Sequence, residues 1–169
     1  TFNSEKTLPK TIESVLNQTF KNFRVIISDN ASTDSTSNIS MKYVENDSRI
    51  KYIKQENNIR LWPNFRFLLN SSKTKYFVWL SSDDFWEPTF LEKNIEVLES
   101  KKNFVCSVSE VDFYGKFTHR YQINDKFPKN TFVKPFIGNT CEKIKLLFKT
   151  PATIMYGIYH TDLLKKFFP

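Results

Sequence analysis

The 169-residue sequence has little cysteine, little glycine and no long apolar run. Its two cysteines, Cys106 and Cys141, are too few for a disulfide scaffold, and no Cys/His cluster indicates a zinc site. Three glycines and seven prolines exclude a collagenous or low-complexity chain. No apolar run is long enough to span a bilayer, and no secretory signal is visible. These absences favour a cytoplasmic protein in a reducing compartment.

Aromatic and basic side chains are abundant instead. Hydrophobic residues make up 40% of the chain and 17 residues are phenylalanine, which is enough apolar surface to exclude intrinsic disorder. The net charge is 25 − 18 = +7, and the basic residues, mostly lysines, are spread along the chain in ones and twos. This pattern favours a solvated surface and leaves open attraction to phosphate, a membrane surface or nucleic acid. Because there are no repeats and no linker-like stretch, we expect one domain over residues 1–169.

Helical and extended patterns alternate along the chain. Ile12, Val15 and Leu16 form one apolar helical face, and the β-branched run over 25–27 is typical of a strand covered on both faces. Such patterns predict helices over 7–19, 34–45, 61–71, 88–100, 139–149 and 162–168, and strands over 23–29, 50–54, 76–80, 104–111 and 154–159, with one more strand between 115 and 135. The alternation predicts an α/β fold with a mostly parallel sheet and helices on both faces. Ligands bind such sheets outside the carboxyl ends of the strands.

Acidic residues follow two of the predicted strands. Asp29 ends the first strand, and Asp83 and Asp84 follow the strand over 76–80. At one rim these carboxylates repel each other unless a cation joins them, and Mg²⁺ binds one or two carboxylates together with water and substrate phosphates. The pattern therefore favours a nucleotide diphosphate held through a divalent metal. A plainer interpretation stays open, because an aspartate after a strand is often a turn residue or a helix cap, and for Asp34 we favour the cap.

Five segments also occur in a characteristic order and spacing: TFNSE, a helix ending in LNQT, VIISDNASTD, LWPNFRFLLNSS and YFVWLSSDDFWEPTFLEKNIEVLE. In this order they resemble the start of family-two glycosyltransferases of the GT-A fold. That family usually has T-Y-N-x-E, S-L-L-x-Q-T, V-D-D-x-S-x-D, N-G-x-x-x-N-x and Y-x-x-x-L-x-x-D-D-x-x-x-P-x-x-L. The match covers about residues 1–115, which the resemblance implies to be the nucleotide-sugar-binding half. Residues 116–169 match loosely and would form part of the acceptor side.

The resemblance implies roles for individual residues. Asp29 would accept a hydrogen bond from a nucleobase, commonly uracil. Asp83 would contact the ribose or a metal-bound water, and Asp84 would reach a Mn²⁺ or Mg²⁺ ion, as the family's variant of the D-x-D motif. The implied nucleotide-binding set is Thr1, Asn3, Glu5, Asp29, Arg60, Asn64 and Asp83, and the implied metal ligands are Asp84 and Asp83.

The sequence departs from the family's pattern in its donor half. Asn30 stands where the family usually has a second acid. The glycine that the family usually has near Arg60 is missing, and so is the strand that usually precedes Thr1. We therefore expect a chain that is truncated at its start.

The catalytic base that the resemblance implies is an aspartate or glutamate after the region that matches residues 157–161. No acidic motif of that kind follows, so we expect the base to lie beyond Pro169, in a chain that is also truncated at its end. Glu110 and Asp112, at the end of the strand over 104–111, are alternative candidates.

The implied function is transfer of a sugar from a nucleotide-diphosphate sugar, commonly UDP-linked, to an acceptor hydroxyl by metal-assisted displacement with inversion. The acceptor would be a saccharide or lipid-linked saccharide in bacterial polysaccharide or glycoconjugate synthesis. The aromatic and basic stretch over 113–136 is compatible with peripheral contact at the inner face of the membrane. The alternative is a non-catalytic nucleotide- or nucleic-acid-binding module. Against nucleic acid, the lysines are not clustered and the acids at strand ends would repel phosphates. The sequence does not indicate an oligomeric state.

Overall fold

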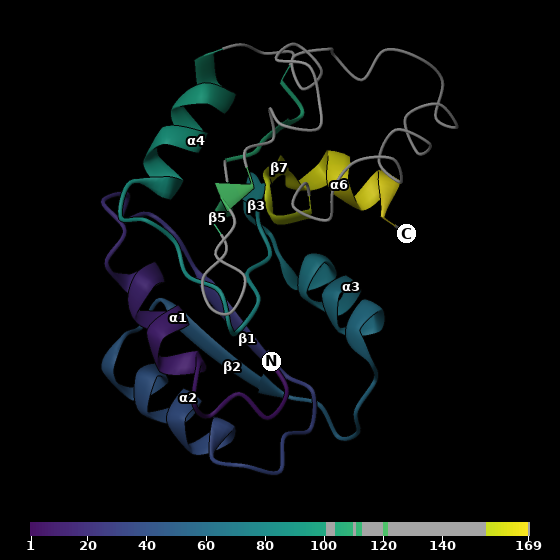
Figure 1. Ribbon diagram of the computed structural model, residues 1–169. Helices are drawn as coiled ribbons and strands as arrows, with labels where there is room; N and C mark the ends of the chain where they lie inside the picture. Colours follow the sequence, from purple (N-terminus) through teal and green to yellow (C-terminus); the bar gives the residue numbers. More distant parts are fainter. Residues whose placement is uncertain (101–103, 110, 113–119, 122–154, 169) are drawn as a thin grey trace.

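The computed structural model describes residues 1–100, 104–109, 111–112, 120–121 and 155–168 (Figure 1). The described helices are α1 (Leu8–Leu16), α2 (Thr36–Asn46), α3 (Leu61–Ser71), α4 (Phe90–Ser100) and α6 (Thr161–Phe167). The described strands are β1 (Val25–Asp29), β2 (Ile50–Lys54), β3 (Tyr76–Phe77), β4 (Cys106–Ser107), β5 (Val111–Asp112), β6 (Arg120–Tyr121) and β7 (Ile158–His160). The expected α/β class is confirmed. The helix expected over 139–149 lies outside the described residues.

One part of the core lies between the β1–β2 pair and the helices α1 and α2. The two strands pair in parallel along their whole length, with α2 as the crossover between them. Helix α1 has Pro9 in its first turn, where the missing N–H has no intrahelical partner to lose. Leu8 and Ile12 on α1 form a buried cluster with Ile27 and Ile50 of the strands. Figure 1 shows α1 and α2 together on one side of the β1–β2 pair.

Helix α3 lies on the opposite side of β1 (Figure 1). Its Asn64 is buried, and the side-chain Nδ2 donates to the carbonyl oxygen of Ser28 at 3.3 Å while the Ser28 hydroxyl donates back to Asn64 Oδ1. Farther along, the buried Trp79 donates its ring N–H to the carbonyl oxygen of Phe65 at 3.1 Å. The Asn64 bonds fix α3 against the end of β1 that carries Asp29, and the Trp79 bond joins α3 to the segment after β3.

A second sheet is antiparallel, with β7 between β3 and β4. Alternating helices and strands predict parallel crossovers between consecutive strands, but β7 arrives from far along the chain and enters in the opposite direction. Tyr76 of β3 lies opposite His160 of β7, and the centroids of the two rings are 4.8 Å apart. Strands β5 and β6 also pair antiparallel, and β6 is the extra strand expected between 115 and 135. The structure is thus mixed, parallel at β1–β2 and antiparallel around β7.

Helix α4 covers this second sheet. Leu91 and Leu98 on α4 pack against Ile158 of β7 in a second buried cluster. Cys106 in β4 is a free thiol, and burial raises its pKa to about 11. None of the helices in the described part of the chain combines the length and the apolar character that a membrane crossing requires.

Candidate functional site

Three loops meet at the carboxyl end of β1. They are the start of the chain (1–5), the turn after β1 (30–35) and the segment between β2 and α3 (55–60). The backbone N–H of Asn30 donates to the carbonyl oxygen of Thr1 at 2.9 Å, and that of Gln55 donates to the carbonyl oxygen of Asp29 at 2.8 Å. The loops therefore form the rim at which ligands of α/β sheets bind.

The first two loops are fastened by reciprocal hydrogen bonds. The backbone N–H of Thr33 donates to Asn3 Oδ1 at 2.8 Å, and that of Ser35 donates to Glu5 Oε2 at 3.0 Å. In return, the N–H of Glu5 donates to Asp34 Oδ2 at 3.1 Å. The structure thus shows Asn3 and Glu5 joining two loops, and their expected contact with a nucleotide stays a prediction.

Asp34 was expected to cap the following helix, but it lies one residue before Ser35, the N-cap of α2. Its Oδ1 accepts a hydrogen bond of 2.9 Å from the backbone N–H of Thr36, the first residue of the helix. Partial burial opposes ionisation, but the hydrogen bonds from Thr36 and from the N–H of Glu5 outweigh it and lower the pKa of Asp34. The carboxylate therefore fixes a loop rather than facing a ligand.

Asp29 is enclosed by the structure, with none of its surface exposed. Its Oδ1 accepts a hydrogen bond of 2.9 Å from the N–H of Ser32, and its Oδ2 accepts one of 2.6 Å from the hydroxyl of Tyr52. Burial, together with the hydrogen bond to Asp29, raises the pKa of Tyr52 to about 12. In this structure Asp29 supports the turn after β1, and the expected nucleobase contact stays a prediction.

The third loop is tied to the second by asparagines. Asn30 Nδ2 donates to Asn58 Oδ1 at 3.0 Å, and Asn30 Oδ1 accepts the N–H of Ile59 at 2.8 Å. Asn58 Oδ1 also accepts the N–H of Arg60 at 2.9 Å. The sequence analysis did not predict a role for Asn58. Two adjacent asparagines, at positions 57 and 58, are typical of a turn and could have indicated it.

Each of the three loops holds one residue other than glycine at a positive φ. These are Asn3 at 47°, Ala31 at 64° and Arg60 at 70°. Arg60 also has ψ 173°, a region that glycine occupies almost alone. Arg60 thus has a backbone conformation that favours glycine, in the region where the family usually has a glycine and this sequence has none. Because such conformations cluster at functional sites, their concentration around one strand end points to a binding site there.

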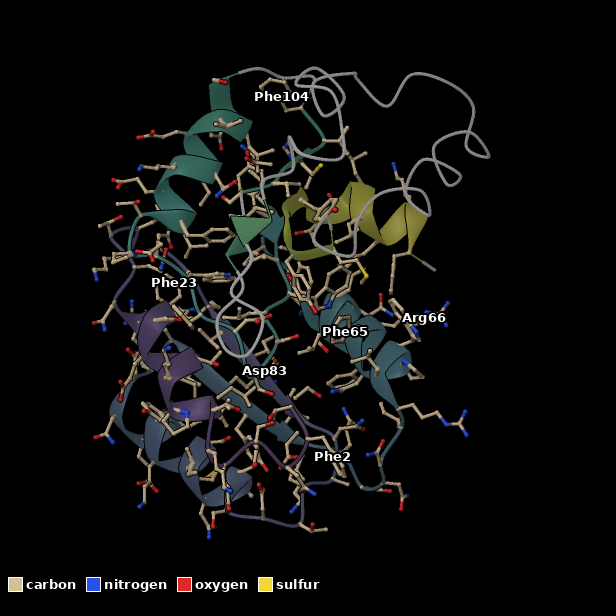
Figure 2. The ribbon with its side chains drawn as sticks, in the orientation of Figure 1. Phe2, Phe23, Phe65, Arg66, Asp83 and Phe104 are labelled. Carbon is tan, nitrogen blue, oxygen red and sulfur yellow. The ribbon has the colours of Figure 1, made fainter. Side chains whose placement is uncertain are left out.

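Ser4 connects this rim to the second acidic segment. Its backbone N–H donates to Thr36 Oγ1 at 2.8 Å, and its hydroxyl lies 2.8 Å from the hydroxyl of Ser82. Asp83 and Asp84 follow directly, and both are exposed. In Figure 2, Asp83 lies near the centre of the view, between α1 and α3. Through Ser4, the start of the chain therefore joins the loops after β1 to the segment after β3, and the expectation that their acids share one rim stays a prediction.

The Asp83–Asp84 pair has the character of a small cation site. Partial burial and the charge of Asp83 raise the pKa of Asp84. Within the described residues, neither carboxylate accepts a hydrogen bond or forms an ion pair, and no cluster of three His, Cys, Asp or Glu side chains exists. Two carboxylates fit Mg²⁺ or Mn²⁺ that takes its remaining ligands from water and phosphate, and they do not fit a metal enclosed by protein alone.

The segment before the acidic pair has a second attachment that the sequence did not reveal. The hydroxyl of Ser81 lies 3.0 Å from the hydroxyl of Tyr156, just before β7. Trp86, which follows the acidic pair, stacks on Phe90 with ring centroids 4.5 Å apart and packs against the second buried cluster.

The proposed catalytic acids remain predictions. Glu110 lies outside the described residues, and of Asp112 only the backbone in β5, opposite Arg120, is described. Arg60 is exposed beside Asn30 and Asn58, where a ligand at the rim could meet its guanidinium.

The family profile for glycosyl transferase family 2 matches residues 1–162. The chain belongs to this family. It is 37% identical over 128 residues to the UDP-Glc:alpha-D-GlcNAc-diphosphoundecaprenol beta-1,3-glucosyltransferase WfaP of Escherichia coli. That match covers 73% of this chain and 50% of WfaP, so the family-2 chain spans about half the length of this relative.

Solved structures with similar folds extend over nearly the whole chain. S. aureus TarS 1–349 in complex with UDP-GlcNAc aligns with 98% of this chain and 45% of its own, with a TM-score of 0.75 and 22% identity. The mannosyltransferase PcManGT from Pyrobaculum calidifontis, in complex with GDP-Man and Mn²⁺, covers 98% of this chain and 44% of its own, with a TM-score of 0.68 and 13% identity. At these identities the likeness shows the fold, which is of the GT-A type.

Proposed function

We propose that the chain forms the donor-binding half of a glycosyltransferase that uses a nucleotide-diphosphate sugar, with UDP as the nucleotide. The observation that carries the proposal is the bridge at Ser4, which joins the strained loops around β1 to the exposed Asp83–Asp84 pair. Uracil and diphosphate are the two ends of one ligand, so a base-binding rim and a cation site have to lie within reach of each other. Family membership supports the same function, and so do the UDP-GlcNAc complex of TarS and the UDP-Glc donor in the name of WfaP.

Asp84, assisted by Asp83, would hold Mn²⁺ or Mg²⁺ against the diphosphate. The raised pKa of Asp84 reflects partial burial and the charge of Asp83, and a bound cation relieves that repulsion. Once bound, the ion supplies positive charge beside the diphosphate that leaves. The Mn²⁺ in the PcManGT complex supports this assignment.

The nucleoside would lie at the loops around β1. Asp29 and Asn64 are buried and bonded within the protein, so they shape the rim from below. Thr1, Asn3 and Glu5 lie in the loop that is bonded to the turn after β1, and we place them at the edge of the rim. The exposed guanidinium of Arg60 would meet the base or a phosphate, because it stands on a loop bonded to Asn30.

The reaction we propose is a single displacement. An acceptor hydroxyl oxygen forms the new bond to the anomeric carbon while the bond from that carbon to the diphosphate oxygen breaks, so the configuration inverts. The hydroxyl proton passes to a carboxylate base. That base would lie beyond Pro169, with Glu110 and Asp112 as the alternatives. The diphosphoundecaprenol acceptor in the name of WfaP supports a lipid-linked saccharide acceptor and a role in bacterial polysaccharide synthesis.

Calorimetric titration of UDP into the full-length protein, with Mn²⁺ and then with EDTA, tests the proposal. We expect binding that requires the metal and is lost in Asp84→Asn. The matched control is Asp162→Asn, which removes the charge of an exposed aspartate in the first turn of α6 and should leave UDP binding unchanged. No UDP binding under either condition would refute the proposal. Metal-dependent UDP binding without sugar transfer to any saccharide acceptor would favour the non-catalytic nucleotide-binding module instead.

A further inference from the structure

Three polar side chains at α1 reach the segment that carries the acidic pair. Thr11 and Ser14 are three residues apart and so share one face of the helix, and Gln18 extends this row four residues farther on. The Thr11 hydroxyl donates to the carbonyl oxygen of Asp84 at 2.7 Å, and Ser14 Oγ accepts the backbone N–H of Trp86 at 3.2 Å. We call these three side chains the α1 polar row.

Gln18 completes the attachment at the start of α4. Its Nε2 donates to the carbonyl oxygen of Glu87 at 2.7 Å, and its Oε1 accepts the N–H of Leu91 at 2.9 Å. Gln18 is fully buried and Thr11 is 6% exposed, so water cannot replace these bonds without opening the interface. The N–H of Thr19 adds a bond of 2.8 Å to the carbonyl oxygen of Pro88.

All partners of the α1 polar row in this segment are main-chain atoms. Residues 81–89 contain no helix or strand, so their backbone path is not set by a ladder of their own. The α1 polar row takes the place of such a ladder, because its hydrogen bonds hold the backbone at Asp84, Trp86 and Glu87. The first fixed point is the main-chain carbonyl of Asp84, the residue whose side chain is the proposed metal ligand.

We propose that Thr11 is a positioning residue for the cation site, and that its hydroxyl sets the direction in which the Asp84 carboxylate points. This inference rests on the proposed function, since it takes Asp84 as a metal ligand. Thr11 does not touch the metal or the nucleotide in this assignment. Thr11 acts through the Asp84 carbonyl, while the hydrogen bond between Ser4 and Ser82 holds the residue that precedes Asp83.

The test uses Thr11→Val, which keeps the shape of the side chain and removes the hydroxyl, and Thr11→Ser, which restores it. Mn²⁺ affinity is measured on the full-length protein from the electron paramagnetic resonance signal of free Mn²⁺, with and without UDP, and Tm is measured in parallel. The matched control is Ser71→Ala, because the Ser71 hydroxyl also donates to a main-chain carbonyl, that of Phe67 at 2.8 Å, in α3. We expect the Mn²⁺ Kd to rise about fivefold in Thr11→Val, the factor that corresponds to one hydrogen bond, and to return to within about twofold in Thr11→Ser.

A purely structural role gives a different result. In that case Thr11→Val and Ser71→Ala lower Tm alike and both leave the Mn²⁺ Kd unchanged, which would overturn the inference while leaving metal-dependent UDP binding intact. If Thr11→Val does not fold, Thr11→Ala removes the same hydroxyl, and an unchanged Kd there overturns the inference equally. Wild-type protein that binds neither Mn²⁺ nor UDP overturns the proposed function, and this inference with it.

Discussion

The hydroxyl of Tyr52 offers a direct measure of how much the enclosed Asp29 carboxylate stabilises the rim. The substitution Tyr52→Phe removes only the hydroxyl oxygen, which donates to Asp29 Oδ2 at 2.6 Å and also lies 2.9 Å from Ser37 Oγ. The ring stays, and with it the packing of residue 52 against the buried cluster of α1, β1 and β2. Asp29 is 0% exposed, so water cannot take the place of the lost donor.

A hydrogen bond to a charged group contributes about 1.5–3 kcal/mol, so we expect Tyr52→Phe to lower the free energy of unfolding by about 2 kcal/mol. For a chain of this size that corresponds to a fall in Tm of about 4–8 °C. Urea denaturation, with the slope m unchanged, measures the loss. The matched control is Tyr43→Phe, since Tyr43 packs against the same cluster and its hydroxyl donates to Glu13 at 3.0 Å in an exposed position. We expect less than about 1 kcal/mol there.

The pH dependence gives an independent check. The pKa of Tyr52 is raised from its ordinary 10.0 to about 12 in the folded protein, by burial and by the bond to Asp29. The stabilisation is therefore fully present below pH 10.0 and is lost as the pH rises through about 12. The stability difference between wild type and Tyr52→Phe should shrink over that window. Equal losses in Tyr52→Phe and Tyr43→Phe, or a difference that is flat across the window, would refute the reasoning.

Two further predictions concern the same rim. Arg60→Gly should raise the free energy of unfolding by about 1 kcal/mol, because glycine adopts φ 70° and ψ 173° without strain. The same variant should weaken UDP binding in calorimetry, because it removes the guanidinium. A lower free energy of unfolding would contradict the assignment of backbone strain to Arg60. Mn²⁺ affinity should fall as the pH is lowered from 7 toward the ordinary aspartate pKa of 3.8, because the raised pKa of Asp84 lets protons compete with the metal at a higher pH than at an ordinary aspartate. An affinity that stays constant in calorimetry across this range would contradict the assignment.

The elements with strong periodicity were predictable from the sequence. The strand over 50–54 and the helix over 61–71 have the same bounds in the structure, because their patterns are set by local residues. The strand expected over 76–80 is paired only at 76–77. Its partner β7 arrives from far along the chain, and no local pattern reports the direction of such a strand. Trp79, which follows the paired residues, is nevertheless buried, with 3% of its surface exposed.

The sequence indicated which residues the candidate site contains, but it indicated little about the hydrogen bonds that those residues form. Spacing and resemblance led to Asp29 and to the Asp83–Asp84 pair, and the structure brings their loops together. The means by which it does so, through Ser4 and the asparagines 30 and 58, could not be predicted, because bonds between side chains and loop backbones have no periodicity. The sequence also could not show that Asp29 is enclosed, since burial depends on Tyr52, which lies on another strand.

The way α1 holds the segment after β3 leaves room for variation among related proteins. The hydroxyls and the amide of the α1 polar row recognise carbonyl and N–H groups, which every residue type except proline provides in full. Substitutions at positions 86 and 87 therefore change side chains without removing the main-chain bonds that hold this segment. Natural selection, or a mutagenesis library directed at these positions, can vary these side chains while the main-chain bonds that hold the segment after the Asp83–Asp84 pair stay in place.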